Sequence, residues 1–184
     1  MGGGASYEDV LVQLGVDRKL IYPVVRDCLM TGKFSYRTMV DFLFDHFQII
    51  GCVSERRKAT NCWERDNQSA RWFTRATELV ARLRQEGNNL VLVSNISTPA
   101  WDTVGAMLEI NTKFDRLFLS FQEGMAKPNK QVWQTVESWF PQSKEFWMIG
   151  DNNDDDLVVP RAMGWQTRLV KNDGSDLLNL WRKK

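Results

Sequence analysis

Short apolar runs alternate with helix-like segments after Gly87, and this alternation restricts the fold more than any other feature of the sequence. The runs are Leu90–Val93, Leu117–Leu119, Phe146–Ile149 and Thr167–Val170. The first three are wholly apolar, as expected for strands that are buried on both faces. Strands that alternate with helices form a mostly parallel sheet. The sequence therefore predicts an α/β fold.

The segments between these runs carry helix signals. Thr98-Pro99 predicts a helix start, with Thr98 as the N-cap and Pro99 at the first helical position. A strongly amphipathic helix is expected to open at 67–70 and to end at Gly87. Further helices are expected over Lys130–Phe140, Asp154–Met163 and Ser175–Trp181.

The chain before residue 68 shows helical spacing and no strand alternation. Helices are expected over Tyr7–Leu14 and Leu20–Met30, and a third should open at Phe34-Ser35. The organisation changes near residue 68. We therefore predict a helical region at residues 1–68 and an α/β core at residues 69–184.

Charge and composition exclude several function classes. The net charge of +1 gives no electrostatic case for binding nucleic acid or an anionic membrane. The basic run Arg56-Arg57-Lys58 is interpreted as a solvated helix end. No apolar stretch approaches the roughly 20 residues that span a bilayer, and no signal peptide is visible. The 3 cysteines lack CxxC spacing, so a reducing, cytoplasmic location is expected.

Polar side chains follow the predicted strands where ligands bind in parallel sheets, at the carboxyl ends. Ser94-Asn95 follows one strand, Asp151 follows another, and Lys127 lies between them in the sequence. A hydroxyl and an ammonium group suit phosphate oxygens. The sequence therefore predicts a phosphate-binding site at this edge.

Four carboxylates stand within six residues at the end of the third run: Asp151, Asp154, Asp155 and Asp156. Negative charge at a helix start is favourable by only about 0.3–1 kcal/mol, which is too little to explain the crowding of like charges. A bound cation would remove the repulsion. Mg²⁺ is bound by one or two carboxylates together with water and phosphate oxygens, so the segment predicts a Mg²⁺ site.

Three segments, in order and with matching intervals, resemble the haloacid dehalogenase (HAD) superfamily. Ser94-Asn95 after an apolar strand resembles its motif II. FDRLFLSFQEGMAKPNKQVW (Phe114–Trp133) is similar to the stretch that carries its motif III lysine, here Lys127. IGDNNDDDLVVPRAMGW (Ile149–Trp165) resembles motif IV. The resemblance covers about Ser69–Val170.

The resemblance implies a HAD-like Rossmannoid core with a mostly parallel sheet. Residues 1–68, with TGKFSYRTMVDFL, resemble the α-helical cap of the subclass I members, which insert the cap after motif I. The closest similarity is to the small capped phosphatases of that subclass. The implied activity is Mg²⁺-dependent hydrolysis of a phosphomonoester in a small phosphorylated metabolite.

The same resemblance implies roles for individual residues. Ser94 would hydrogen-bond the transferring phosphoryl group, and Asn95 would shape the loop. Lys127 would hold the charges of the nucleophile and the phosphate together. Asp151 would ligate Mg²⁺, and Asp156 would be the second motif IV carboxylate. Asp155 takes that place if the shorter family spacing applies, and Asp154 has no role beyond the helix start.

The family's motif I, an apolar strand followed by Asp-x-Asp, is not found. Its first Asp is the nucleophile and its second the general acid and base. Asp9, Asp17, Asp173 and Asp176 lack the spacing or the preceding strand. We therefore expect an N-terminally shortened chain that is inactive as written.

In the family, the motif I strand lies between the strands that here end at Ser94 and Asp151. Without it, each of these strands would lose a neighbour. Three candidates could fill the gap: the segment Val10–Val12, direct pairing of the two strands, or a strand from another chain. A strand from a second copy of this chain would mean self-association.

Two other functions remain as hypotheses. The first is a non-catalytic HAD-like module that acts by binding a partner. The second is a haloacid dehalogenase-type hydrolase. The dehalogenase branch works without a metal, so the acidic motif IV favours the phosphatase branch.

Overall fold

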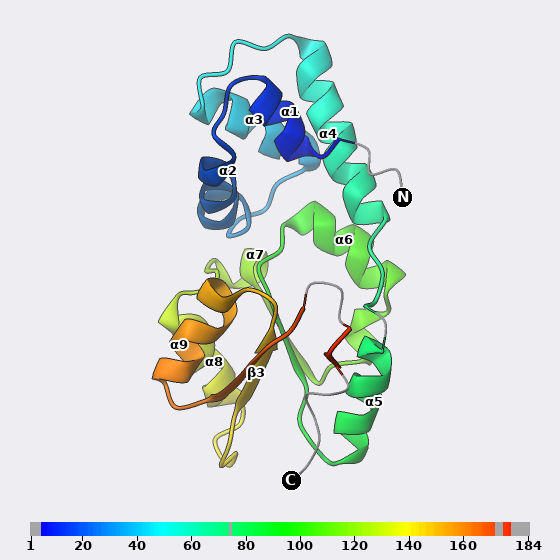
Figure 1. The fold of residues 1–184 in the computed structure, drawn as a ribbon, viewed down its shortest axis with the longest axis vertical. Coiled ribbons are helices and arrows are strands. Elements are labelled where there is room, and N and C mark those ends of the chain that lie inside the picture. The colour runs from blue at the N-terminus through cyan, green and yellow to red at the C-terminus, as the bar shows by residue number, and fades with distance from the viewer. Residues whose placement is uncertain (1–4, 74, 172–174, 178–184) are drawn as a thin grey trace. The chain divides into compact units, whose positions relative to one another are not determined.

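The computed structural model describes residues 5–73, 75–171 and 175–177. The chain divides into two compact units (Figure 1). Unit 1 comprises Met1–Ala70, Asn95–Leu108 and Ser120–Gly124. Unit 2 comprises Arg71–Ser94, Glu109–Leu119 and Met125–Lys184.

Unit 1 is helical throughout the residues that are described. The hydroxyl of Ser6 accepts a hydrogen bond from the Asp9 amide, and the Asp9 carboxylate accepts one from the Ser6 amide, so a capping box starts the first helix. Ser35 caps α3 in the same way through Thr38, at the expected position. The helices are α1 (Tyr7–Gln13), α2 (Arg18–Val24) with the π-helical turn η1 (Val25–Leu29), α3 (Tyr36–His46), α4 (Val53–Gln68), α6 (Thr98–Met107) and α7 (Ser120–Glu123).

The core of unit 1 lies among the first four helices, where α1 and α3 both pack on α4. Trp63 of α4 stacks on Tyr7 of α1 with ring centroids 3.9 Å apart. The buried side chains around this pair are apolar, and they include Leu11, Ile21, Met39, Leu43, Phe44 and Ala59.

The long helix α4 was not expected from the sequence, and the predicted helix start at 67–70 is wrong. Residues 67 and 68 end α4, and the next helix, α5, begins at Ala76 after Arg75 in a left-handed conformation. Only Ala59, Cys62 and Trp63 of α4 are buried. Because this apolar stripe is narrow and the rest of the helix is polar, its periodicity is weak.

Unit 2 contains the expected strands, each within one residue of its predicted bounds. Its elements in chain order are α5 (Ala76–Gln85), β1 (Val91–Ser94), η2 (Ile110–Thr112), β2 (Arg116–Leu119), α8 (Lys130–Trp139), β3 (Trp147–Gly150), η3 (Asn153–Leu157), α9 (Val158–Ala162) and β4 (Gln166–Leu169). Together with the helices of unit 1, they confirm the α/β class.

Three helix boundaries differ from the predictions or lie beyond the described residues. The N-cap of α6 is Ser97 and not Thr98 as predicted. Thr98 is the first helical residue, and its hydroxyl donates to the Gly32 carbonyl (3.3 Å). The helix expected at Asp154–Met163 begins with the π-helical turn η3. Most of the helix expected at Ser175–Trp181 lies outside the described residues.

The strands form two separate parallel pairs instead of one sheet. β1 pairs with β2, from Val91 opposite Arg116 to Ser94 opposite Leu119. β3 pairs with β4, from Trp147 opposite Gln166 to Gly150 opposite Leu169. No pairing of β1 with β3 is found among the described residues.

Two of the expected ways to fill the gap are therefore wrong. Val10–Val12 lies within α1, where Val10 and Leu11 are buried in the core of unit 1. Direct pairing of the two inner strands does not occur in the described part of unit 2.

Helix α8 packs against both strand pairs of unit 2, and α5 packs against the pair formed by β3 and β4 (Figure 1). Trp133 and Val136 of α8 pack in a cluster with Val91 of β1 and Met148 of β3. Ile149, which follows Met148, points to the other face and packs with the α5 cluster. Both faces of β3 are therefore covered.

No helix among the described residues has both the length and the apolar character needed to cross a membrane.

The core of unit 1 predicts a specific response to truncation. Leu43 is fully buried, and Leu20 is 55% exposed. Leu43→Ala should lower the free energy of unfolding by about 2–5 kcal/mol, because a cavity remains in a packed core. Leu20→Ala should change it by less than about 0.5 kcal/mol. Urea denaturation of both variants measures the difference, and equal losses would contradict this assignment of the core.

Candidate functional site

A buried ion pair lies at the carboxyl end of β3. The Lys127 ammonium donates to Oδ1 of Asp156 at 2.6 Å, and the two side chains are only 11% and 5% exposed. Lys127 precedes α8 in the chain and Asp156 lies in η3, so the contact joins two segments that are 29 residues apart. A buried pair requires further hydrogen bonds to offset desolvation.

Asn152 and Gly150 supply the surroundings that hold this pair. The Asn152 amide donates to Oδ2 of Asp156 at 3.1 Å. The Asn152 side chain accepts from the amides of Asp154 and Asp155, which fixes the start of η3. A Cβ on Gly150 would lie 2.3 Å from Asp156 Oδ2, so only glycine allows this approach.

The four carboxylates divide into a buried and an exposed pair. Asp155 and Asp156 are each 4% exposed, and the Asn152 side-chain amide donates to Asp155 at 3.3 Å. Asp151 and Asp154 are exposed. Asp154 accepts from the Asn153 side chain, whereas Asp151 makes no side-chain hydrogen bond or ion pair within the described residues. Asp151 therefore has a carboxylate available for a ligand.

Ser94 is the last residue of β1 and is half-buried. Asn95 follows it and is counted with unit 1. Within unit 1, the fully buried Ser120 accepts a hydrogen bond from the Ile96 amide (2.9 Å) and donates to the Ile96 carbonyl (3.1 Å). Ser120 thus fixes the loop that follows Ser94, a role for which no sequence pattern provides a signal.

Ser94 and Asp151 follow strands that run in the same direction. The segments that lead into β1 and β3, at residues 87–89 and 143–145, line one cavity of unit 2. The amino ends of the two strands therefore lie together, and so do their carboxyl ends. Lys127 and Asp156 are in direct contact, and a single site that also includes Ser94 and Asp151 stays a prediction.

The donor set fits a single Mg²⁺ through Asp151. The four carboxylates of residues 151–156 and the Lys127 ammonium that pairs with Asp156 leave three negative charges, which a divalent cation would largely neutralise. Mg²⁺ needs only one or two carboxylates when water and phosphate oxygens complete the shell. Among the described residues, no group of three or more His, Cys, Asp or Glu side chains forms a ready-made metal cluster. The ligation of Mg²⁺ by Asp156, whose two oxygens already accept hydrogen bonds, stays a prediction.

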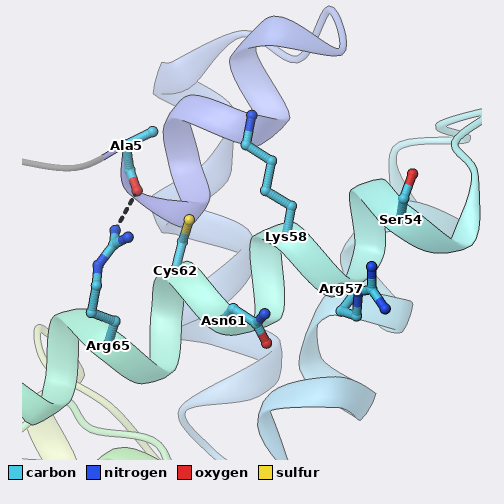
Figure 2. Close-up of a pocket in the computed structure, with 7 residues that line it drawn as sticks. All are labelled: Ala5, Ser54, Arg57, Lys58, Asn61, Cys62 and Arg65. Atoms are coloured by element: carbon cyan, nitrogen blue, oxygen red, sulfur yellow. Dashed lines mark hydrogen bonds between the residues drawn. The ribbon is translucent and has the colours of Figure 1, made fainter.

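A second concave surface, of about 440 Å³, lies along α4 in unit 1 (Figure 2). Arg65 donates to the carbonyl of Ala5 at 2.6 Å, and Lys58 and Arg57 extend from the preceding turns. Arg56 instead points to α3, where it pairs with Asp41 and Asp45 (both 3.1 Å). The basic side chains along the surface are exposed, as in a solvated helix face.

Comparison with known proteins identifies a family. Residues 46–164 match the model of the haloacid dehalogenase-like hydrolases. This match covers more than half of the chain and includes Ser94, Lys127, Asp151 and Asp156. A search of the curated proteins finds no match.

Solved structures share the fold at low sequence identity. A HAD family enzyme from Bacteroides thetaiotaomicron, solved as a magnesium complex, has a TM-score of 0.70 at 19% identity, over 100% of this chain and 96% of that one. The HAD-hydrolase YfnB from Bacillus subtilis, bound to magnesium, has a TM-score of 0.62 at 21% identity, over 88% of this chain and 72% of that one. A protein described as a predicted phosphoglycolate phosphatase from Haemophilus somnus has a TM-score of 0.57 at 14% identity, over 95% of this chain and 88% of that one.

The buried ion pair makes a testable contribution to stability. Lys127→Met should lower the free energy of unfolding by about 3–5 kcal/mol, because the Asp156 charge stays buried without its partner. Adding Asp156→Asn should restore about half of the loss, since the two effects are coupled. Urea denaturation of the single and double variants measures this coupling.

Lys130, an exposed lysine at the start of α8, provides the matched control. Lys130→Met should change the free energy of unfolding by less than about 0.5 kcal/mol. Additive losses for Lys127→Met and Asp156→Asn would contradict a direct contact.

Proposed function

Because the chain belongs to the haloacid dehalogenase-like hydrolases, we propose that the carboxyl end of β3 binds the phosphoryl group of a small phosphorylated molecule together with Mg²⁺. The reaction that such a site serves is the hydrolysis of a phosphomonoester. The observation that carries the proposal is the buried Lys127–Asp156 pair beside the exposed Asp151.

Each residue has a role that follows from its surroundings. The Lys127 ammonium is held in place by its bond to Asp156, and its positive charge would attract a phosphate oxygen. The Ser94 hydroxyl would donate to the same phosphoryl group from the end of β1, with Asn95 shaping the loop. Asp156 fixes the position of Lys127. Asp151 would ligate Mg²⁺, with Asp156 as the second carboxylate.

Magnesium would supply positive charge to the phosphate oxygens as they approach this acidic segment. Family members with this fold have been solved as complexes with magnesium, and one with magnesium and inorganic phosphate. These complexes support the choice of Mg²⁺ and phosphate as ligands of this chain.

The described residues do not supply the nucleophile that a covalent phosphoryl-transfer mechanism requires. No Asp-x-Asp stands directly at the end of β1, β2 or β3, and the run Asp154-Asp155-Asp156 begins only after three further residues and lies in η3. We therefore propose that residues 1–184 bind phosphate and Mg²⁺ without turnover, and that hydrolysis needs a carboxylate from outside these residues. A non-catalytic binding module has the same properties, and it differs in needing no such carboxylate for its function.

Phosphate binding tests the proposal directly. Titration calorimetry with inorganic phosphate in the presence of Mg²⁺ should show binding that Lys127→Met weakens about 10- to 100-fold, since a charged hydrogen bond is lost. Lys130→Met should bind as tightly as the unchanged chain. An unaltered affinity in Lys127→Met, or no phosphate binding by the folded chain, would overturn the proposal.

Turnover provides a separate test. With Mg²⁺ and p-nitrophenyl phosphate, the chain should release no phosphate above the rate without protein, because no nucleophile is positioned in the described residues. Magnesium-dependent release that Asp151→Asn abolishes would contradict this, and would show that residues 1–184 already contain the nucleophile.

A further inference from the structure

We propose that a basic groove on α4 in unit 1 is a docking site for an extended acidic segment of a separate polypeptide. This groove is the concave surface of about 440 Å³ in Figure 2, and it is lined by Ala5, Ser54, Arg57, Lys58, Asn61, Cys62 and Arg65. All seven residues belong to unit 1, and none of them is part of the proposed phosphate and magnesium site.

The lining residues of α4 lie on one face of the helix. From Ser54 to Arg65 they follow one another at intervals of three or four residues, the spacing that places side chains side by side on a helix. In Figure 2, Lys58 and Arg65 extend from the same side of α4, and the buried Cys62 lies between them. The carbonyl of Ala5 accepts from Arg65 at 2.6 Å and holds this guanidinium group at one end of the groove.

The positive charge of the groove is poorly compensated within the described residues. No Asp or Glu is among the residues that line it there. Arg65 pairs with Asp66 at 3.3 Å. Arg57 and Lys58 are exposed, and their side chains form no hydrogen bond or ion pair in the part of the chain that the structure describes. The groove therefore presents at least two positive charges to a ligand.

The sequence alone indicates a solvated helix end for Arg56-Arg57-Lys58, and the structure gives these residues different surroundings. Arg56 turns to α3 and pairs with Asp41 and Asp45 (both 3.1 Å). Arg57 has no acidic residue three or four positions away in either direction, where a partner on the same helix would stand. Pairing within unit 1 thus explains Arg56 and leaves Arg57 without a structural role.

The lining of the groove determines the class of its ligand. Pockets for small molecules are lined mostly by apolar and aromatic side chains, whereas the described lining has no aromatic ring and only Ala5 and Cys62 as small apolar residues. Single-stranded nucleic acids bind by stacking their bases on aromatic rings, which are lacking here. Clusters of arginine and lysine recognise acidic motifs by charge-assisted hydrogen bonds. An acidic polypeptide segment is the ligand that fits.

The spacing of the charges fits an extended chain. Lys58 and Arg65 are seven residues apart, which is about 10 Å along a helix. Acidic residues at positions i and i+3 of an extended polypeptide are also about 10 Å apart. One segment can therefore place a carboxylate at each end of the groove. Residues 1–4 of this chain carry no acidic side chain and cannot supply these carboxylates.

A peptide titration of the full chain, followed by nuclear magnetic resonance, tests this inference. The probe is a glycine-serine peptide of about seven residues, about 23 Å long when extended, with glutamate at every third position. It should shift the amide signals of Arg57, Lys58 and Asn61 in a saturable way. A peptide with glutamine in place of glutamate should not. Raising the salt concentration from about 50 to about 300 mM should weaken binding at least about threefold, because exposed charges are screened.

Charge-matched variants locate the site on the protein. Arg57→Gln combined with Lys58→Gln removes two positive charges from the groove and should weaken peptide binding at least about fivefold. Lys19→Gln combined with Lys33→Gln removes the same charge from exposed positions of unit 1 outside the groove. This control should change the affinity less than about twofold, because distant exposed charges are screened.

Four results would overturn the proposal. One is the absence of peptide binding by a chain that circular dichroism shows to be folded. Another is equal weakening by the two double variants, which would reveal an effect of net charge alone. The third is tighter binding of single-stranded DNA than of the peptide to the same residues. The last is a dimer in analytical ultracentrifugation that only the Arg57→Gln and Lys58→Gln variant disrupts, because a second copy would then be the occupant.

Discussion

The absence of pairing between β1 and β3 among the described residues is the constraint on which the rest of unit 2 depends. Each parallel pair has only two strands, and pairs of that size are marginal by themselves in water. Helix α8 packs on both pairs, and α5 adds a second covered face on the pair formed by β3 and β4. The candidate site lies at the carboxyl ends of these strands, so the spacing of β1 from β3 sets the distance between Ser94 and Asp151.

The Lys127–Asp156 pair brings order to an acidic segment that would otherwise repel itself. Asp156 reaches its buried position because Gly150 has no side chain, and Asn152 holds the turn that follows. Asp151 then remains exposed beside a buried positive charge. A bound phosphate group would be attracted to the Lys127 ammonium, and a magnesium ion would neutralise the Asp151 carboxylate. The two ligands are proposed together for this reason.

The sequence predicted most of unit 2 because its strands are apolar on both faces, and these short runs were placed within one residue. It placed Asp151 directly after a strand, as is found, while the roles of Lys127 and Asp151 stay predictions. It failed at α4, where only a narrow stripe is buried, and at Gly150 and Ser120. Their roles depend on contacts with Asp156 and Ile96, and such contacts between distant residues leave no pattern in the sequence.

Amide hydrogen exchange in the chain alone, followed by nuclear magnetic resonance, tests the central claim that β1 and β3 do not belong to one continuous sheet. The account predicts that the amides of Val91, Val93 and Ile149 exchange at least about tenfold faster than those of Leu92 and Met148, which face β2 and β4. Equal protection of both sets would contradict it, because a strand would then already occupy the space between β1 and β3.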